Sequence, residues 1–394
     1  MTCPTFALVA ALALAACADA PAGDRPDAVS ATDGAVADSG ALAPRLVESV
    51  HGPFLTWVEP DGDGHALRFA RWTGDGWNDA STVDRGDDWF VNWADTPGAF
   101  PYSDDATFAH TLRRRGGHAY DIVVRLDGPD GRGDPFVLHT DGREAEHGFV
   151  SAVPFEGGVA VVWLDGREQA GGHGHGGDMT LRAVVLDSDG TRRGETVLDA
   201  RTCDCCPTAL ARTRDGLVAA YRDRSPGEIR DVAVVRYADG AWTEPTIPHA
   251  DGWEIAGCPV NGPALASRGD RAALAWYTEA DVPRVRLSIS DDGGETWAEP
   301  VRIDGGAPIG RVDVTLLDDG SPVVSWLERV SEGAEVRVRR LGAAAPVTVA
   351  AVPSGRESGI PQIAALFDPA SELSVLVAWT DAAAGTVRSA LVAP

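Results

Sequence analysis

The feature that most constrains the fold of this chain is a repeat of 50 to 58 residues. In each copy an apolar β-type run ends in a side chain that is usually large, and a further residue, usually polar, follows two positions later. These anchor residues are Trp57, Thr111, Trp163, Tyr221, Trp276, Trp326 and Trp379. A strand-rich repeat of this length predicts β-propeller blades, because a four-stranded unit buries its faces only against neighbouring units. We therefore predict an all-β chain with seven blades.

Composition agrees with a single large β-domain over residues 43–394, which we expect to be a monomer. The 394 residues include 45 Gly and 26 Pro, enough for many tight turns. The 34 basic residues are all Arg, and the 59 acidic residues bring the net charge to -25. Nucleic acid is excluded as a partner, since it would require a positive surface. The last blade offers only three strands before Pro394, so the closure of the ring is left open.

The N-terminus carries a targeting signal and a tether. Residues 6–16 form a short apolar run that is too brief to span a bilayer and leads into Cys17. This segment, residues 1–17, resembles a bacterial lipoprotein signal with Cys17 as the acylated residue. Residues 18–42 are rich in Ala, Asp, Gly, Pro and Ser and are expected to be a flexible linker. We expect a lipid-anchored protein of the bacterial cell envelope, which contacts the membrane only through this anchor.

One turn has a specific signature, Ser-x-Asp-x-Gly-x-Thr-Trp, between the third and fourth strands of the fifth blade. Its defined positions are Ser290, Asp292, Gly294, Thr296 and Trp297. The carboxylate is expected to accept turn N–H groups, glycine to supply a positive φ, and tryptophan to pack between sheets. With this Asp-box the chain resembles the sialidase or neuraminidase superfamily, and more closely a group of bacterial sialidase-like lipoproteins. The resemblance implies a glycan-related role and offers six blades, as in sialidases, as the alternative to seven.

A propeller places the loops that enter each blade on one face, around the mouth of the central channel. Two residues past each anchor stand Glu59, Arg113, Asp165, Asp223, Thr278, Glu328 and Asp381. Five of these seven are carboxylates, so we expect a ring of negative charge at the mouth. Arginines flank it, and a mixture of carboxylate and guanidinium groups favours a hydroxylated acidic ligand.

The resemblance to sialidases implies an arginine triad for the substrate carboxylate, a tyrosine nucleophile assisted by glutamate, and an aspartate acid/base. The catalytic candidates are Tyr221, Glu228, Asp165 and Asp223, with Tyr277 and Glu279 as alternatives for the nucleophile and its base. The substrate-binding candidates are Arg167, Arg222, Arg224, Arg230, Arg311, Asn261, Trp93 and Asp95. A salt-bridged loop that only holds its shape is the competing interpretation of residues 221–231.

The chain departs from true sialidases near its start, where Arg45 stands outside the expected arginine motif. We therefore predict a protein that binds acidic glycans, with exo-sialidase-type hydrolysis as a hypothesis. A non-catalytic interaction or assembly scaffold is the first alternative.

Four cysteines occupy two loops that enter consecutive blades. Cys203 precedes Tyr221 by 18 residues and Cys258 precedes Trp276 by 18, so both hold equivalent positions. We predict a Cys203–Cys258 disulfide and a vicinal Cys205–Cys206 disulfide, without a cofactor. The alternative is a copper or zinc site. It would combine Cys203, Cys205, Cys206 and Cys258 with His147, His173 and His175.

Overall fold

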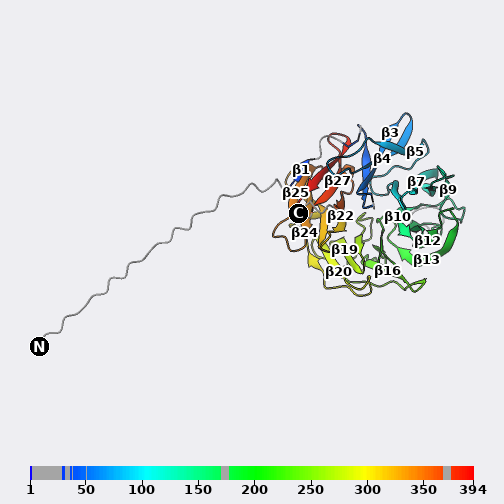
Figure 1. Ribbon diagram of the computed structural model, residues 1–394. Helices are drawn as coiled ribbons and strands as arrows, with labels where there is room; N and C mark the ends of the chain where they lie inside the picture. The colour runs from blue at the N-terminus through cyan, green and yellow to red at the C-terminus, as the bar shows by residue number, and fades with distance from the viewer. Residues whose placement is uncertain (2–28, 32–35, 38, 50, 170–176, 367–373) are drawn as a thin grey trace.

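Each of the seven repeats forms one antiparallel sheet of four strands, and the sheets stand around a common axis (Figure 1). The computed structural model describes residues 1, 29–31, 36–37, 39–49, 51–169, 177–366 and 374–394. Apart from Met1, the predicted signal segment with Cys17 lies outside these ranges. The arrangement is a seven-bladed β-propeller. The prediction of seven blades is confirmed, and the six-bladed alternative is wrong.

The first three blades follow the chain strand by strand. Blade 1 contains β2 (Leu42–Val47), β3 (Phe54–Asp61), β4 (Gly64–Arg71) and β5 (Ser81–Gly86). Blade 2 contains β6 (Gly98–Pro101), β7 (Thr107–Gly116), β8 (Ala119–Asp127) and β9 (Phe136–Val137). Blade 3 contains β10 (His147–Phe155), β11 (Gly158–Asp165), β12 (Met179–Leu186) and β13 (Arg192–Thr202).

Blades 4 to 6 repeat this order. Blade 4 contains β14 (Ala209–Arg212), β15 (Leu217–Arg222), β16 (Val232–Ala238) and β17 (Ala241–Trp242). Blade 5 contains β18 (Ala264–Arg268), β19 (Arg271–Thr278), β20 (Arg284–Ser290) and β21 (Val301–Arg302). Blade 6 contains β22 (Pro308–Leu316), β23 (Pro322–Arg329), β24 (Ala334–Arg340) and β25 (Val347–Val352). A 3-10 turn, η1 (Arg356–Ser358), is the only helical element in the part of the chain that the structure describes.

The seventh blade is completed by the two ends of the chain. It contains β26 (Gln362–Ala365), β27 (Val375–Asp381), β28 (Thr386–Val392) and, at its edge, β1 (Val29–Ala31). β1 pairs antiparallel with β28, with Val29 opposite Val392. The strand missing from the end of the chain is thus supplied by a segment that the sequence analysis placed in the linker. Residues 18–28 of that linker lie outside the described ranges.

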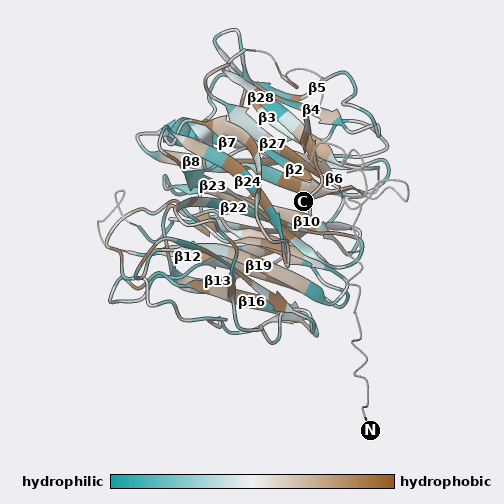
Figure 2. Ribbon diagram, turned by 90° about the vertical axis from the view of Figure 1, so that its left-hand side faces the viewer, coloured by the Kyte–Doolittle hydropathy of each residue, from teal (hydrophilic) through white to brown (hydrophobic). Residues whose placement is uncertain are grey.

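Seven hydrophobic clusters hold the ring together, one between each pair of neighbouring blades. Trp163 of β11, for example, packs with Phe108 and Leu112 of β7 between blades 2 and 3. Figure 2 shows hydrophobic residues along strands such as β2 and β27. All seven anchor positions lie in the second strand of their blade, which explains their regular spacing.

The five anchor tryptophans share the same kind of cross-strand neighbour on the third strand of their blade. In five blades the tryptophan stands directly opposite an arginine. The pairs are Trp57 and Arg68, Trp163 and Arg182, Trp276 and Arg286, Trp326 and Arg337, and Trp379 and Arg388. Opposed residues of an antiparallel pair share one face, so each indole lies beside a guanidinium.

The turn that carries the Asp-box signature has the contacts expected from its sequence. Asp292 accepts hydrogen bonds from the backbone N–H of Thr296 at 2.9 Å and from its hydroxyl at 2.5 Å. Gly294 adopts a φ of 84°, and Trp297 packs against the cluster between blades 4 and 5. This turn is therefore a structural element.

Within the described ranges, no helical segment has both the length and the apolar character needed to cross a bilayer.

Candidate functional site

A cavity of about 240 Å³ lies on the propeller axis, where the innermost strands of all seven blades begin. Its walls come from residues 43–47, 93–96, 149–153, 207–210, 260–265 and 311–313, together with positions near 360. The side chains that give it chemical character are Arg45, Trp93, Asp95, Asn261, Arg311, Asp313 and Gln362. Four of these, Trp93, Asp95, Asn261 and Arg311, are residues that the sequence analysis selected.

Two carboxyl groups line this cavity, that of the buried Asp95 and that of the half-buried Asp313. Asp95 accepts hydrogen bonds from the Tyr120 hydroxyl at 2.8 Å and from the Phe149 N–H at 2.7 Å. Asp313 accepts the N–H of Ile363 at 2.9 Å. Burial raises the pKa of each carboxyl group to about 7, although these hydrogen bonds act in the opposite direction. Both groups therefore titrate near neutral pH.

Arg45 interacts electrostatically with both carboxyl groups, and its positive charge lowers the pKa of each. Its guanidinium donates to the carbonyls of Thr96 at 3.2 Å and Val150 at 3.3 Å. Neither Arg45 nor Asp313 is among the site residues predicted from the sequence. Their positions on the innermost strands of blades 1 and 6 are the signal that could have found them.

Arg311 supplies the second guanidinium group of the cavity. Its backbone conformation is strained, with a φ of 56°. It donates to the carbonyls of Gly355 at 2.7 Å and Gly359 at 3.2 Å, and it stacks 4.5 Å from the centre of the Trp93 ring. Asn261 accepts the Arg311 N–H at 2.7 Å. Burial lowers the pKa of Arg311 to about 10, so it remains charged at neutral pH.

The remaining sialidase-type candidates lie elsewhere and are engaged in structural contacts. Tyr221 is 1% exposed in the core between blades 3 and 4, and its hydroxyl donates to Asp199 at 2.5 Å. Burial and Asp199 raise its pKa far above the ordinary value, which disfavours a phenolate nucleophile. Arg222 is also 1% exposed and donates to three backbone carbonyls. Asp223 is half-buried, with a raised pKa caused first by burial.

Glu228 is held by two arginines. It accepts Arg224 at 2.8 Å and Arg230 at 2.8 Å, and these bonds lower its pKa to about 2. The Tyr277 hydroxyl donates a hydrogen bond at 3.1 Å to Glu279, two residues further along the chain. The segment 221–231 thus has the ion pairs of a loop that holds its shape.

Three of the five carboxylates two residues past the anchors bind the indole of their own anchor tryptophan, so these three do not form the expected ring of charge at the mouth. Side chains two apart on a strand share a face. The indole N–H groups of Trp57, Trp163 and Trp326 accordingly donate to Glu59 at 3.0 Å, Asp165 at 2.8 Å and Glu328 at 2.5 Å. In blade 5 the equivalent position is Thr278, and Asp251 accepts the Trp276 indole at 2.6 Å instead. Buried donors are thereby satisfied.

Asp165 and Arg167 belong to a buried cluster, the histidine cluster, which also contains Asp121, His139, Asp141 and His147. The imidazole rings of His139 and His147 stack in parallel, with centroids 3.5 Å apart and planes 5° apart. His139 Nδ1 lies 2.5 Å from Asp141, and Arg167 pairs with Asp165 at 2.7 Å. Burial, followed by the neighbouring His147, lowers the pKa of His139.

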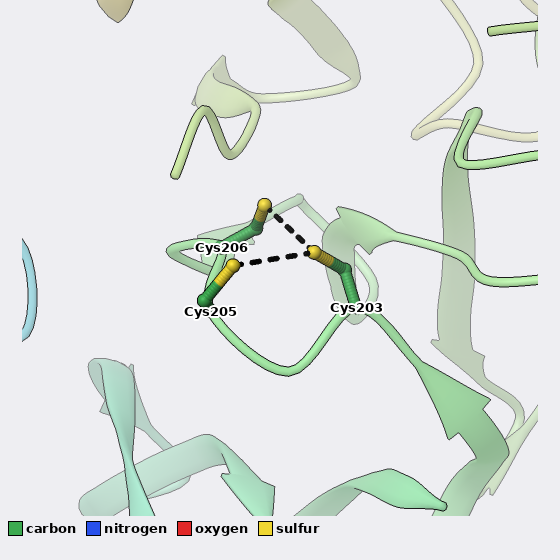
Figure 3. Close-up of side chains that lie close together, drawn as sticks. All are labelled: Cys203, Cys205 and Cys206. Carbon is green, nitrogen blue, oxygen red and sulfur yellow. Dashed lines mark hydrogen bonds between the residues drawn. The ribbon is translucent and has the colours of Figure 1, made fainter. Parts of the chain in front are cut away.

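The four thiols that the structure describes are free, so both predicted disulfides are wrong. Cys203 Sγ lies 2.9 Å from Cys206 Sγ and 3.9 Å from Cys205 Sγ (Figure 3). The Cys258 thiol instead interacts with the Cys205 thiol. The turn at residues 204–205 brings Cys206 back toward Cys203, which a pairing based on equivalent loop positions could not foresee.

The histidines of the alternative metal set are not gathered around these thiols. His147 shares its cluster with Asp121 and His139, whereas the thiol cluster consists of Cys203, Cys205 and Cys206. His173 and His175 lie outside the residues that the structure describes.

No protein-family model matches the chain, and no curated protein is significantly similar to it. Among solved structures, AofleA from Arthrobotrys oligospora is 12% identical, with a TM-score of 0.48 and coverage of 83% of this chain and 93% of that chain. A PL25 polysaccharide lyase, an ulvan lyase, is 12% identical, with a TM-score of 0.47 and coverage of 78% and 80%. Hadza microbial sialidase Hz136 is 14% identical, with a TM-score of 0.43 and coverage of 73% and 63%. Likenesses this distant carry no argument about function, and the fold rests on the sheet order above.

Proposed function

We propose that the protein binds a small acidic, polyhydroxylated ligand, such as one sugar residue of an acidic glycan, in the axial cavity. The observation that carries this proposal is the convergence of two guanidinium groups, two carboxyl groups and two amides on one cavity of about 240 Å³. Hydroxyl groups both donate and accept hydrogen bonds, and a mixed lining supplies partners for both roles. The volume lies just below the roughly 300 to 1,000 Å³ of common ligand sites, which favours a single sugar unit.

Charge supports an acidic ligand over a neutral one near and below pH 7. Arg311 remains cationic, whereas Asp95 and Asp313, with pKa values raised to about 7 by burial, are largely neutral in mildly acidic solution. A protonated carboxyl group donates a hydrogen bond to an anion, and an ionised one repels it. We therefore expect affinity for the acidic ligand to fall as the pH rises through about 7.

Calorimetric titration of the full chain with N-acetylneuraminate, glucuronate and glucose tests the proposal. Arg311→Met should weaken binding of the two acidic sugars about 10- to 100-fold, the loss expected for one charge-assisted hydrogen bond. Arg85→Met, on the outer strand of blade 1, is the matched control and should change nothing. Circular dichroism and a thermal melt establish that each variant is folded. Failure of the wild-type chain to bind either acidic sugar, or equal binding by Arg311→Met, would refute the proposal.

Hydrolysis is a second possibility, and it is favoured by one observation. Asp95 and Asp313 line the same cavity and have pKa values near 7, as general acids and bases require. Fluorogenic sialoside and glucuronide substrates test it directly. Product release that is lost in both Asp95→Asn and Asp313→Asn would support an enzyme. Binding without product release would leave a glycan-binding protein, and no binding at all would favour the scaffold alternative.

A further inference from the structure

We propose that Cys203, Cys205, Cys206 and Cys258 form a binding site for a soft d10 metal ion, Zn²⁺ or Cu⁺, separate from the axial cavity. Three of the thiols follow β13 within one tight loop, and their Sγ atoms all lie within 4.8 Å of one another. Figure 3 shows the Cys203 sulfur facing the sulfurs of Cys205 and Cys206. Thiolate sulfur is the preferred ligand of both ions.

The sulfur separations fit a metal-binding loop. A Zn–S bond of about 2.3 Å implies tetrahedral S–S edges of about 3.8 Å. Cys203 and Cys205 are already 3.9 Å apart. Cys206 is 2.9 Å from Cys203, so these two side chains must separate by roughly 1 Å to admit the ion. A covalent disulfide would instead require closure to about 2.05 Å, and this is the competing chemistry.

The fourth sulfur comes from the neighbouring loop. Cys258 lies between β17 and β18, and its thiol interacts with that of Cys205, but its Sγ lies outside the group of three sulfurs within 4.8 Å of one another. Cys203 and Cys206 are buried, Cys205 is half-buried and Cys258 is exposed. The group therefore has three inner thiols and one outer thiol at the solvent boundary, where an ion could enter and be enclosed.

A buried arginine contacts the thiol cluster and supplies a positive charge beside the sulfur atoms. Arg230 is 4% exposed, and its Nη1 donates to Cys203 Sγ at 3.2 Å. Its Nη2 donates to Glu228 at 2.8 Å. Glu228 also accepts a hydrogen bond from Arg224, which donates to Asp204 at 3.3 Å as well. The arginine-rich segment that resembled a substrate clamp thus supports the cysteine loop. Outer hydrogen bonds of this kind orient metal ligands and tune their charge.

Metal titration of the reduced full chain tests the site. A Cys3→Ser, Cys17→Ser background removes the two other thiols of the sequence. This background should bind one equivalent of Zn²⁺ or Cu⁺, release thiol protons on binding, and show sulfur-to-metal charge-transfer absorption when Co²⁺ is used as a probe. Chelator competition then gives the affinity.

Cys205→Ser and Cys258→Ser are the informative variants, because these positions are not fully buried and tolerate a hydroxyl group. Loss of an outer hydrogen bond costs about 10- to 100-fold in affinity, so loss of the Cys205 ligand should cost at least about 100-fold. Ser103→Ala, in an exposed turn of blade 2, is the control and should bind as the background does.

Cys258→Ser separates the two ions. Four-coordinate Zn²⁺ should lose affinity about as strongly as in Cys205→Ser, whereas Cu⁺, which three thiolates can satisfy, should lose much less. A variant with all four sites changed to Ser gives the non-specific baseline. The proposal is overturned if the background binds no more of either metal than this baseline does. It is also overturned if thiol counting on the unfolded, unreduced background finds a stable Cys203–Cys206 disulfide. Neither outcome would affect sugar binding at the axial cavity, so the two proposals fail independently.

Discussion

The thiol cluster and the histidine cluster both gather side chains that bind metals, yet they differ in how the donor atoms are arranged. Among the thiols, sulfur faces sulfur, and the charged group in contact is an arginine. In the histidine cluster the ring nitrogens face carboxylates. His139 Nε2 lies 3.4 Å from Asp121, and His147 Nε2 lies 3.4 Å from Asp141.

Ring geometry decides against a shared ion in the histidine cluster. An imidazole lone pair lies in the plane of its ring, but the two rings are parallel with centroids 3.5 Å apart. An ion placed in one plane would therefore lie well outside the other. The lone pairs of a thiolate are not confined to one plane. Rotation about the Cα–Cβ bond also lets the sulfur turn toward the ion. Proximity of metal-binding residue types is thus a weaker signal than the direction of their donor orbitals.

The largest expected effect comes from breaking the histidine cluster at Asp165. This carboxylate is fully buried and pairs with Arg167 at 2.7 Å while accepting the Trp163 indole. Removing one partner of a buried ion pair leaves an uncompensated charge, so Asp165→Ala should lower the free energy of unfolding by about 3 to 5 kcal/mol. Urea denaturation measures this. Asp291→Ala, which removes an exposed pair with Arg271, is the control and should cost about 1 kcal/mol or less. A small effect at Asp165 would contradict a structural role for the cluster.

The next effect is stabilisation by zinc, which should depend on the thiols alone. At a free Zn²⁺ concentration of 100 times Kd, binding to the folded chain should add about 2.7 kcal/mol to its unfolding free energy. Cys205→Ser should abolish this gain, and His147→Gln should retain it. Thermal melts with and without zinc distinguish the two. If His147→Gln loses the gain and Cys205→Ser keeps it, the roles of the two clusters are reversed.

The ring could be predicted from the sequence because its determinants are local and repeated. Trp57, Trp163 and Trp276 recur where a second strand must fill the gap between two sheets, so their spacing reports the blade. Closure could not be predicted. β1 is only three residues long, and its partner β28 lies more than 350 residues away in the chain. A segment so short has no periodicity of its own.

The candidate site was predictable only in part. Four of the predicted binding residues line the axial cavity, namely Trp93, Asp95, Asn261 and Arg311. The predicted residues also include Tyr221, whose phenol is indistinguishable in sequence from a reactive one until its burial is known. The thiols illustrate an intermediate case. Equivalent loop positions placed Cys258 near the other three, but the torsions of residues 203–206 decide which sulfurs meet.

A smaller effect is the pH dependence contributed by the histidine cluster. Burial lowers the pKa of His139 in the folded chain, so below about pH 6.5 the unfolded chain takes up the proton more readily. The contribution of His139 to stability should therefore fall as the pH drops from 7.5 to 5, by at most about 1.4 kcal/mol per pH unit. His139→Gln should remove this contribution from the pH profile measured by urea denaturation. His110, whose pKa burial lowers to about 3, adds a slope of the same sign, whereas Asp95 and Asp313, whose pKa values burial raises to about 7, add slopes of the opposite sign, and all three remain in this variant. An unchanged slope in His139→Gln would show that the imidazole is not held neutral.

The smallest expected effect is at Arg230, and it tests whether the arginine acts on sulfur or only on the loop. A lysine keeps the charge but cannot reach Cys203 Sγ and Glu228 together, as the two guanidinium nitrogens do at 3.2 and 2.8 Å. Arg230→Lys should weaken zinc binding about tenfold, the low end of the loss for an outer hydrogen bond, in chelator competition. Because lysine keeps the positive charge, Arg230→Lys should lower the unfolding free energy of the metal-free chain less than Asp165→Ala does.

Arg224→Lys is the matched control for Arg230→Lys. Arg224 shares the contact with Glu228 and also reaches Asp204, but within the described residues it makes no hydrogen bond to a cysteine sulfur. If Arg230 acts through Cys203, the control should bind zinc nearly as well as the wild type. Equal weakening in both variants would mean that the ion pairs support binding only by fixing the loop. In that case a charged group beside the donor atom would not explain why the thiols bind zinc. The difference from the histidine cluster would then lie in the conformation of the backbone that positions the donor atoms.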